Sequence, residues 1–282
     1  MASLQDIKRR IKSVTNTRQI TKAMQLVAAS KLRRYAQAAT LPKAYVDAAN
    51  TLLANLGASA EVAQNPLYQT RKVNNALTIL VAGDRTLAGP YNSNIFRAFN
   101  GHLKTLGVPQ KVISVGRRAG HQIIGVRNID EIASYSIEGG VGDVELAQPI
   151  LKQIIDKFTA GDVDVVHIIY TQYNSTVSQE IKIKQVLPVV SPTSAGVSSE
   201  LEPSPEAVID LVTKKLLESQ ILLAFLESRA SEQAARMIAM MNASDNADDL
   251  IKDYTLDYNN ARQQAITQEL AEISAGTEAM NA

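Results

Sequence analysis

The sequence has no cysteine, no tryptophan and only three histidines among its 282 residues. Without cysteine the chain has no disulfide, no thiolate metal site and no cysteine nucleophile. The histidines, His102, His121 and His167, have no second ligand three or four residues away, so we interpret them as core or surface residues. The composition therefore argues against a catalytic metal centre, and we predict no catalytic residue, no metal and no cofactor.

Long hydrophobic runs are also missing. No apolar run approaches the ~18 residues that a membrane span requires. The N-terminus, MASLQDIKRR, lacks the apolar stretch of a signal peptide. With a hydrophobic share of 45% we expect a soluble, globular chain. We further expect that it starts in the compartment where it is made, unless a targeting segment has already been removed.

Glycine and proline are absent from Glu206 to Ala275. Since these residues interrupt helices most strongly, the segment predicts a helix of ~70 residues, roughly 105 Å long at about 1.5 Å per residue. Within it, small, apolar and aromatic residues recur alternately three and four apart, the pattern of a coiled-coil seam. We call these positions the C-terminal seam: Met237, Met240, Ser244, Ala247, Ile251, Tyr254, Tyr258, Ala261 and Ala265.

The N-terminal segment shows the same helical periodicity. Pro42 is its first helix breaker and predicts a kink, after which the helical pattern resumes as far as Gly57. Residues 1–60 hold ten Lys or Arg against two Asp, whereas residues 200–282 hold 15 Asp or Glu against six Lys or Arg. We therefore predict that helices at 1–60 and 205–282 pair as an antiparallel coiled coil. The expected N-terminal stripe is Leu4, Ile7, Ile11, Val14, Ile20, Met24, Val27, Ala28, Leu32 and Tyr35.

Residues 73–195 have a different pattern, in which β-branched runs alternate with helical stretches. The expected strands are 76–83, 111–116, 163–173 and 178–190, and the expected helices are near 93–106, 117–124 and 143–160. This alternation predicts a Rossmann-like α/β domain with a largely parallel sheet, inserted between the two terminal helices. The segments GVGD and SPTSAGVSSELEPSPE are expected to be loops.

One loop of this domain stands where nucleotide-binding folds hold phosphates. LVAGDRTLAGPYNSNIF, residues 80–96, joins a strand to a helix but contains neither GxGxxG nor GxxxxGK[ST]. We interpret it as a turn whose helix is capped by Asn92 or Ser93. Arg117 and Arg118 are interpreted as a solvated helix start. A nucleotide-binding enzyme with coiled-coil oligomerisation helices remains an alternative, as does a nucleic-acid-binding scaffold with the basic clusters KRRIK and KLRR.

Three blocks of sequence resemble one family. They are SLQDIKRRIKSVTNTRQITKAMQLVAASKLRR (3–34), AGDRTLAGPYNSNI (82–95) and SEQAARMIAMMNASDNADDLIKDYTLDYNNARQQAITQELAEI (231–273). Together they resemble the gamma subunit of the rotary, proton-translocating F-type ATP synthase, over the whole length and in the right order. The pattern Ile266-Thr267-x-Glu269-x-x-Glu272-x-x-x-Gly276 is similar to the family's C-terminal signature.

The resemblance implies a central-stalk rotor with no catalytic site of its own. The paired helices would form a shaft inside a hexamer of alpha and beta subunits, and the α/β domain would sit on the c-ring beside the epsilon subunit. It also implies beta-subunit contacts, for which the matching residues are Lys22, Met24, Arg236, Gln263, Thr267 and Glu269. Met24 is equally well explained as a coiled-coil residue. The implied contacts with the c-ring and epsilon are Leu201 and Glu202.

Two further implications concern location and regulation. We expect a peripheral membrane protein on the cytoplasmic face of a bacterial energy-coupling membrane, with organellar and thylakoid membranes as alternatives. Absence of cysteine excludes the thiol switch of chloroplast relatives. The chain departs from the family's common central loop at Thr86, Ala88 and Pro90, and Thr277 stands where Ala is usual.

Overall fold

The computed structural model describes residues 4–56, 64–126, 128–136, 143–190 and 204–281. These residues form two compact units. One unit comprises residues 29–236, and the other comprises residues 1–28 together with 237–282. The helices α1 (Leu4–Ala38) and α7 (Pro205–Asn281) contribute residues to both units.

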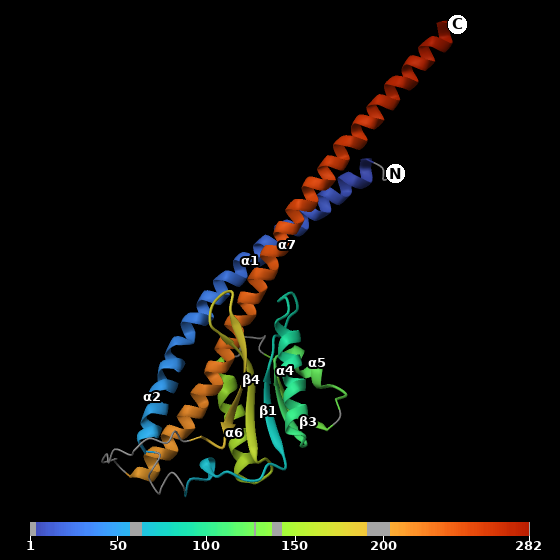
Figure 1. The fold of residues 1–282 in the computed structure, drawn as a ribbon. Coiled ribbons are helices and arrows are strands. Elements are labelled where there is room, and N and C mark those ends of the chain that lie inside the picture. The colour runs from blue at the N-terminus through green and yellow to red at the C-terminus, as the bar shows by residue number, and fades with distance from the viewer. Residues whose placement is uncertain (1–3, 57–63, 127, 137–142, 191–203, 282) are drawn as a thin grey trace. The chain divides into compact units, whose positions relative to one another are not determined.

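The first unit is built around a five-stranded sheet (Figure 1). Its strands are β1 (Ala76–Val81), β2 (Gln110–Val115), β3 (Ile129–Tyr135), β4 (Val165–Tyr173) and β5 (Gln179–Leu187). They lie in the order β3-β2-β1-β4-β5, with β1 to β4 parallel and β5 antiparallel to β4. The largely parallel sheet predicted from the sequence is confirmed.

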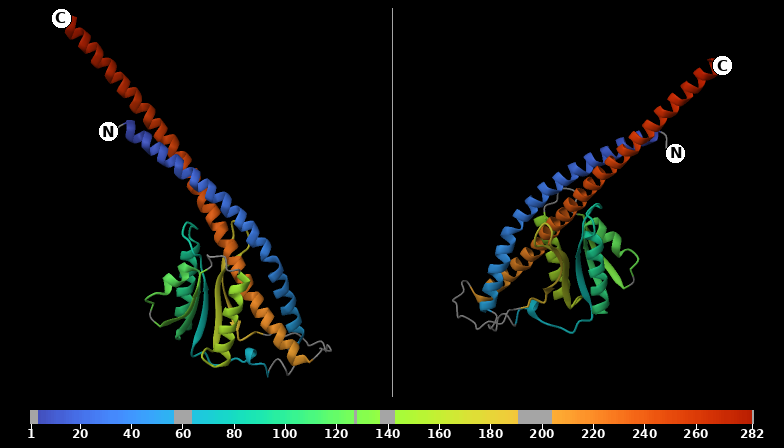
Figure 2. Two further views of the ribbon diagram at one scale, coloured as in Figure 1. Left: turned by 180° about the vertical axis from the view of Figure 1, so that it is seen from behind. Right: turned by 45° about the horizontal axis from the view of Figure 1, so that its top comes forward.

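Helices cover both faces of this sheet (Figure 2). The helix α6 (Asp143–Thr159) and part of α7 pack on one face, around Phe158 and Phe225. On the other face lie α4 (Tyr91–Leu106) and α5 (Arg117–Ile123), around Phe99. All six residues of β1 are buried because this central strand is covered on both sides.

Two shorter elements complete the unit. The helix α2 (Thr40–Leu56) packs Val46, Ala49 and Leu53 against α7, and a 3₁₀ helix, η1 (Pro66–Tyr68), leads toward β1. The helical path is interrupted at Ala39, between α1 and α2. This position follows from Pro42, whose ring crowds the carbonyl four residues earlier and interrupts the helix there.

The second unit is an antiparallel pair made by the first part of α1 and the last part of α7. Arg18 forms an ion pair with Asp248 at 2.8 Å, and the hydroxyls of Thr21 and Ser244 are 2.7 Å apart. The partner numbers fall along α7 as they rise along α1, so the helices run in opposite directions. Every residue of the C-terminal seam is buried or half-buried, so the predicted coiled-coil pattern is confirmed.

The N-terminal stripe was partly wrong. Ile20 and Val27 are 61% and 56% exposed, while Thr21 is 9% exposed. The seam stays on the three-and-four spacing through Val14, Arg18 and Thr21, and a polar residue fits there because Ser244 supplies a hydroxyl partner. Apolar character alone therefore misassigned this part of the helix.

The sequence analysis also missed one strand. β3, with the sequence IDEIASY, is an edge strand with no buried residue along its length. Its charged and small residues give no apolar alternation, and the strand depends on pairing with β2. The other predicted strands and helices of the domain are present, with ends shifted by one to a few residues.

Candidate functional site: the strand ends and the terminal helix

In open α/β sheets, ligands bind outside the carboxyl ends of the strands, at the point where the strand order reverses. In this chain the reversal lies between β1 and β4, because the connections from β1 lead first to β2 and β3 and then back to β4. A nucleotide-binding member of this fold class would hold its ligand beside the ends of these two strands. This edge is therefore the candidate binding site of the domain.

Side chains of α7 occupy the end of β4. The backbone N–H of Thr171 donates to Ser228 Oγ at 3.1 Å, and Ser231 Oγ donates to the Thr171 carbonyl at 3.1 Å. Pairing between β1 and β4 ends at Ile169, so Thr171 has no β1 residue opposite it. The two helix hydroxyls thus satisfy strand groups that would otherwise be buried without partners.

The loop after β1 is held by a second group of bonds. The Gly83 N–H donates to Asn92 Oδ1 at 3.0 Å, and the Arg117 N–H donates to Asp84 Oδ1 at 2.7 Å. The expected capping role of Asn92 or Ser93 is wrong: the N-cap of α4 is Pro90, and Ser93 Oγ donates back to the Pro90 carbonyl. Asn92 does not cap α4 because its amide oxygen already bonds to the loop.

Glu232 and Arg236 of α7 lie against this loop. Arg236 Nη2 is 2.6 Å from Glu232 Oε1 and donates to the Thr86 carbonyl at 3.3 Å. A Cβ atom at Gly83 would lie 3.0 Å from Glu232 Cδ, so the carboxylate occupies the space beside the glycine. Glu232 and Arg236 are 9% and 8% exposed. A carboxylate paired with an arginine therefore stands where this loop would approach a phosphate, so both the space and the cation at this position are already taken.

Tyr91 completes the group, at the start of α4. Burial raises the pKa of its hydroxyl well above the usual value, and the neighbouring Glu232 raises it further. The nearby hydroxyls of Ser228 and Thr171 oppose this shift in part. The phenol is thus neutral at every physiological pH.

A second buried polar group joins α7 to the sheet further along. Glu227 is 5% exposed, and burial raises the pKa of its carboxyl, an effect opposed by the positive charges of Lys43 and Lys184. Burial lowers the pKa of Lys184, against the attraction of Glu227. Burial and the carboxyl together raise the pKa of the Tyr170 hydroxyl. These groups come from four elements, α2, β4, β5 and α7, and each influences the pKa of another.

The histidines fit the core interpretation. The rings of His102 on α4 and His167 on β4 pack edge to face with centroids 4.6 Å apart. Burial, as the main cause, and the neighbouring His102, as a smaller one, lower the pKa of His167 to about 4. Within the described part of the chain, no three His, Asp or Glu side chains are grouped in a way that could hold a metal ion.

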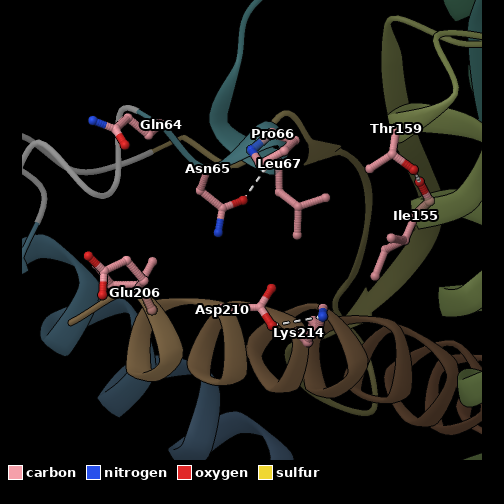
Figure 3. A pocket seen from close by; sticks show the side chains of 10 residues that line it. Gln64, Asn65, Pro66, Leu67, Ile155, Thr159, Glu206, Asp210 and Lys214 are labelled. Carbon is pink, nitrogen blue, oxygen red and sulfur yellow. Dashed lines mark hydrogen bonds and ion pairs between the residues drawn. The ribbon is translucent and has the colours of Figure 1, made fainter. Parts of the chain in front are cut away.

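A cavity of about 350 Å³ lies elsewhere, between η1, the end of α6 and the first turns of α7 (Figure 3). Leu67, Ile155 and Ile209 line it together with polar side chains from its rim. Lys214 pairs with Asp210 at 2.8 Å. The cavity is remote from the carboxyl ends of β1 and β4, and the lysine that lines it is already paired with Asp210.

The structure distributes the residues implied as beta-subunit contacts over both units. Lys22 is exposed and Met24 half-buried on α1, while the exposed Gln263, Thr267 and Glu269 lie on the last turns of α7. Thr267 Oγ1 donates to the Gln263 carbonyl at 2.9 Å. By contrast, Arg236 is buried in the first unit, bonded to Glu232 and the loop. The implied c-ring and epsilon contacts Leu201 and Glu202 lie outside the described residues.

Sequence reasoning overlooked Ser228, Ser231 and Glu232. They stand in ILLAFLESRASEQAARMI, residues 221–238, where polar residues interrupt an otherwise apolar and alanine-rich stretch. Polar residues at positions that helical periodicity places on the core face are the signal that could have revealed the contact with the sheet.

An α/β domain inserted between two terminal helices that pair in an antiparallel coiled coil is the architecture of a rotary central stalk. The fold is similar to a chain of the OSCP/F1/c-ring assembly of the Euglena gracilis mitochondrial ATP synthase in rotational state 3, with a TM-score of 0.67 and 19% identity, covering 98% of this chain and 94% of that chain. It is also similar to a chain of the central stalk and c-ring of the Tetrahymena thermophila mitochondrial ATP synthase, with a TM-score of 0.63 and 24% identity, covering 80% and 99%.

The sequence comparisons define the family. Residues 3–280 match the family described as ATP synthase. The ATP synthase gamma chain of Moorella thermoacetica is 36% identical over 282 residues, with 99% of this chain and all of the relative covered. The gamma chain of Chlorobium chlorochromatii is 37% identical with both chains covered in full. The chain belongs to the ATP synthase gamma-chain family and is the rotor subunit of the central stalk.

Proposed function

We propose that this chain is a non-catalytic rotor that transmits torque between a proton-driven c-ring and the catalytic alpha/beta hexamer, coupling proton flow to ATP synthesis and hydrolysis. The observation that carries the non-catalytic part is the filled edge between β1 and β4. Ser228, Ser231, Glu232 and Arg236 of the chain's own helix occupy the position where this fold class binds nucleotides. The domain is thereby attached to a helix instead of to a ligand.

Torque transmission requires a stiff shaft, and two properties of α7 meet that need. The helix runs from Pro205 to Asn281 without a break, and no glycine or proline occurs between Glu206 and Ala275. Along its second part, small residues such as Ser244 and Ala247 are buried against α1. A close-packed pair with an unbroken hydrogen-bond ladder resists bending better than either helix alone.

Contacts with the beta subunits are proposed at two places on the second unit. Lys22 belongs to the basic first part of α1, in which Lys8, Arg9, Arg10 and Lys12 are also exposed. A cationic segment of this kind favours an acidic partner and would guide its approach. Met24 lies two residues after Lys22, and its side chain is half-buried in the coiled coil. At the other place, Gln263, Thr267 and Glu269 supply exposed polar groups near the end of α7.

Arg236 is proposed to act on the beta subunit through the loop that it holds. Its guanidinium donates to the Thr86 carbonyl and pairs with Glu232, so it fixes residues 84–90 instead of facing outward. In that loop, Leu87 adopts a left-handed backbone conformation with φ of 64° and is 57% exposed. A contact through the loop would keep the family role of this arginine while its own side chain stays buried.

The remaining proposals concern the base of the rotor and its location. We propose that Leu201 and Glu202 contact the c-ring and the epsilon subunit. No helix among the described residues is long and apolar enough to span a membrane. Several curated gamma-chain relatives are bacterial, which supports a peripheral position on the cytoplasmic face of a bacterial energy-coupling membrane.

Reconstitution tests the rotor function. The full chain and a variant lacking residues 259–282 are each mixed with alpha and beta subunits of a related ATP synthase, and steady ATP hydrolysis is measured. We expect the full chain to assemble with the hexamer and raise hydrolysis, and the deletion to weaken assembly or coupling. The pure chain, which serves as the control, should hydrolyse no ATP.

Two results would contradict this proposal. One is nucleotide binding or hydrolysis by the pure chain combined with no complex under several choices of partner, which would revive the enzyme hypothesis. The other is retention on DNA at ~0.15 M salt, which would revive the nucleic-acid scaffold.

A further inference from the structure

The contact between the sheet and α7 has two chemically different parts, both inside the unit formed by residues 29–236. One is apolar, where Leu217, Ile221 and Phe225 of the helix join the main core on the sheet. The other begins one turn later and is polar, where Ser228 and Ser231 bond the backbone of Thr171. Side chains on the same side of the helix thus change from apolar to hydrogen-bonding along its length.

The two parts respond differently to a twisting load. Apolar burial is non-directional, so a helix that rotates slightly about its axis keeps most of that contact. Hydrogen bonds prefer donor angles above about 150° and short distances, and they weaken steeply well outside these limits, so they confine rotation to a smaller range than apolar packing does. The two serine bonds are buried and meet both backbone groups of one residue, which fixes the direction of the helix face relative to β4.

The position of these bonds along the chain is also informative. The first unit is connected to the second at two points, between residues 28 and 29 in α1 and between residues 236 and 237 in α7. Torque that enters the α/β domain has to leave it through these two helices. Ser228 and Ser231 stand on α7 within its last three turns before the second of these points.

We propose that Ser228 and Ser231, bonded to Thr171, are positioning residues that lock the α/β domain to α7 against rotation about the helix axis. The proposal rests on the rotor function and adds the site at which the α/β domain is fixed to α7. The consequence is that these bonds set the largest torque that the contact can transmit. When they are weakened, the domain and the helix stay assembled through the apolar contact, but the helix rotates relative to the sheet when the opposing torque is large.

The test uses the complete ATP synthase in membrane vesicles, carrying either the parent chain or the double variant Ser228→Ala and Ser231→Ala. ATP synthesis is driven by a fixed proton gradient and measured at a low and at a high ratio of ATP to ADP and phosphate. A high ratio raises the torque that the rotor must deliver. ATP hydrolysis by the detached F1 part is measured in parallel, because there the domain carries no load.

We expect synthesis to be nearly unchanged at the low ratio and to fall about 25-fold at the high ratio, because the net loss of each of the two buried hydrogen bonds changes an equilibrium about fivefold. Hydrolysis by detached F1 should remain at the parent level. Each single variant should give an intermediate loss, which preserves the test if the double variant assembles poorly.

A matched control is Ser244→Ala. Ser244 is a buried serine of the same helix whose hydroxyl bonds Thr21, so both partners belong to the paired helices and neither to the sheet. This variant should show no load dependence. Equal losses at both ratios, a parallel loss in detached F1, or no loss at the high ratio would each overturn the lock. A parent chain that fails to restore hydrolysis would instead overturn the rotor function itself.

Discussion

The two parts of α7 differ sharply in their surroundings although they belong to one unbroken helix. In the first unit, thirteen of the sixteen residues from 221 to 236 are buried, and they include the polar Ser228, Ser231 and Glu232. In the second unit only a seam is covered, and every described side chain from 266 to 277 is exposed. The first part is enclosed like a core helix and the second is open like the surface of a shaft.

This difference shows how one helix serves two mechanical purposes. The enclosed part is fixed to its own domain by core packing and by directional bonds to strand ends. The open part keeps its exposed residues for other chains and uses small side chains to approach α1. The stability of the chain should therefore depend more strongly on residues before Met237 than on residues after it.

Replacing a core residue of the enclosed part should have the largest effect. Phe225 is 1% exposed in the main core, so Phe225→Ala should lower the free energy of unfolding by about 4 kcal/mol through lost burial and a residual cavity. Ile273→Ala, at a position 64% exposed, should change it by less than about 0.5 kcal/mol. Urea denaturation of the purified chain, followed by circular dichroism, measures both, and equal effects would remove the contrast.

Next in size is the loss of a buried charge partner. Arg236→Met leaves the Glu232 carboxylate buried without its cation and should cost about 3 kcal/mol, part of which Glu232→Gln in the same chain should restore. The control is Lys252→Met, which breaks the exposed pair with Asp249 in the open part and should leave the urea midpoint unchanged. A double variant no more stable than Arg236→Met would show that the charge pair is not the cause.

Acid should weaken the domain through its histidine pair. The folded pKa of His167, about 4, lies below the ordinary 6.5, so between these values the unfolded chain binds a proton that the folded chain does not. Stability should therefore fall as the pH drops from 6.5 toward 4, by about 1–2 kcal/mol once solvent screening of this partly exposed ring is allowed for. His167→Gln should flatten this dependence relative to the parent, whereas His121→Gln, at an exposed site, should leave it unchanged. Thermal unfolding across this pH range tests both.

The smallest effect is expected in the coiled coil. Ser244→Ala removes the buried hydroxyl pair with Thr21 and should cost about 1 kcal/mol. Thr21→Val combined with Ser244→Ala should recover most of it, because an apolar pair leaves no unsatisfied hydroxyl. Thermal unfolding of the two variants and the parent decides this, and a double variant that loses the sum of the single losses would refute the pairing.

Much of the architecture could be predicted from the sequence because it depends on local patterns. The length of α7 follows from the absence of glycine and proline, and its seam follows from small and apolar residues at regular spacing. The α/β alternation was visible in runs of β-branched residues. The strand β3 was not, since an edge strand with charged residues is stabilised by its neighbour more than by its own composition.

By itself, the sequence determined the two helices, the α/β class and the family, because periodicity, helix breakers and motif order are properties of neighbours along the chain. Only the tertiary structure decided what the strand ends do. Ser228 and Ser231 lie 57 and 60 positions after Thr171 in the sequence. No local pattern shows that the hydroxyl of a helix residue will contact the backbone of a strand so far away. The sequence pattern likewise gives no sign that Arg236 is buried. Folding brings the Thr86 carbonyl close to the pair formed by Glu232 and Arg236, so the arginine is buried and holds the loop.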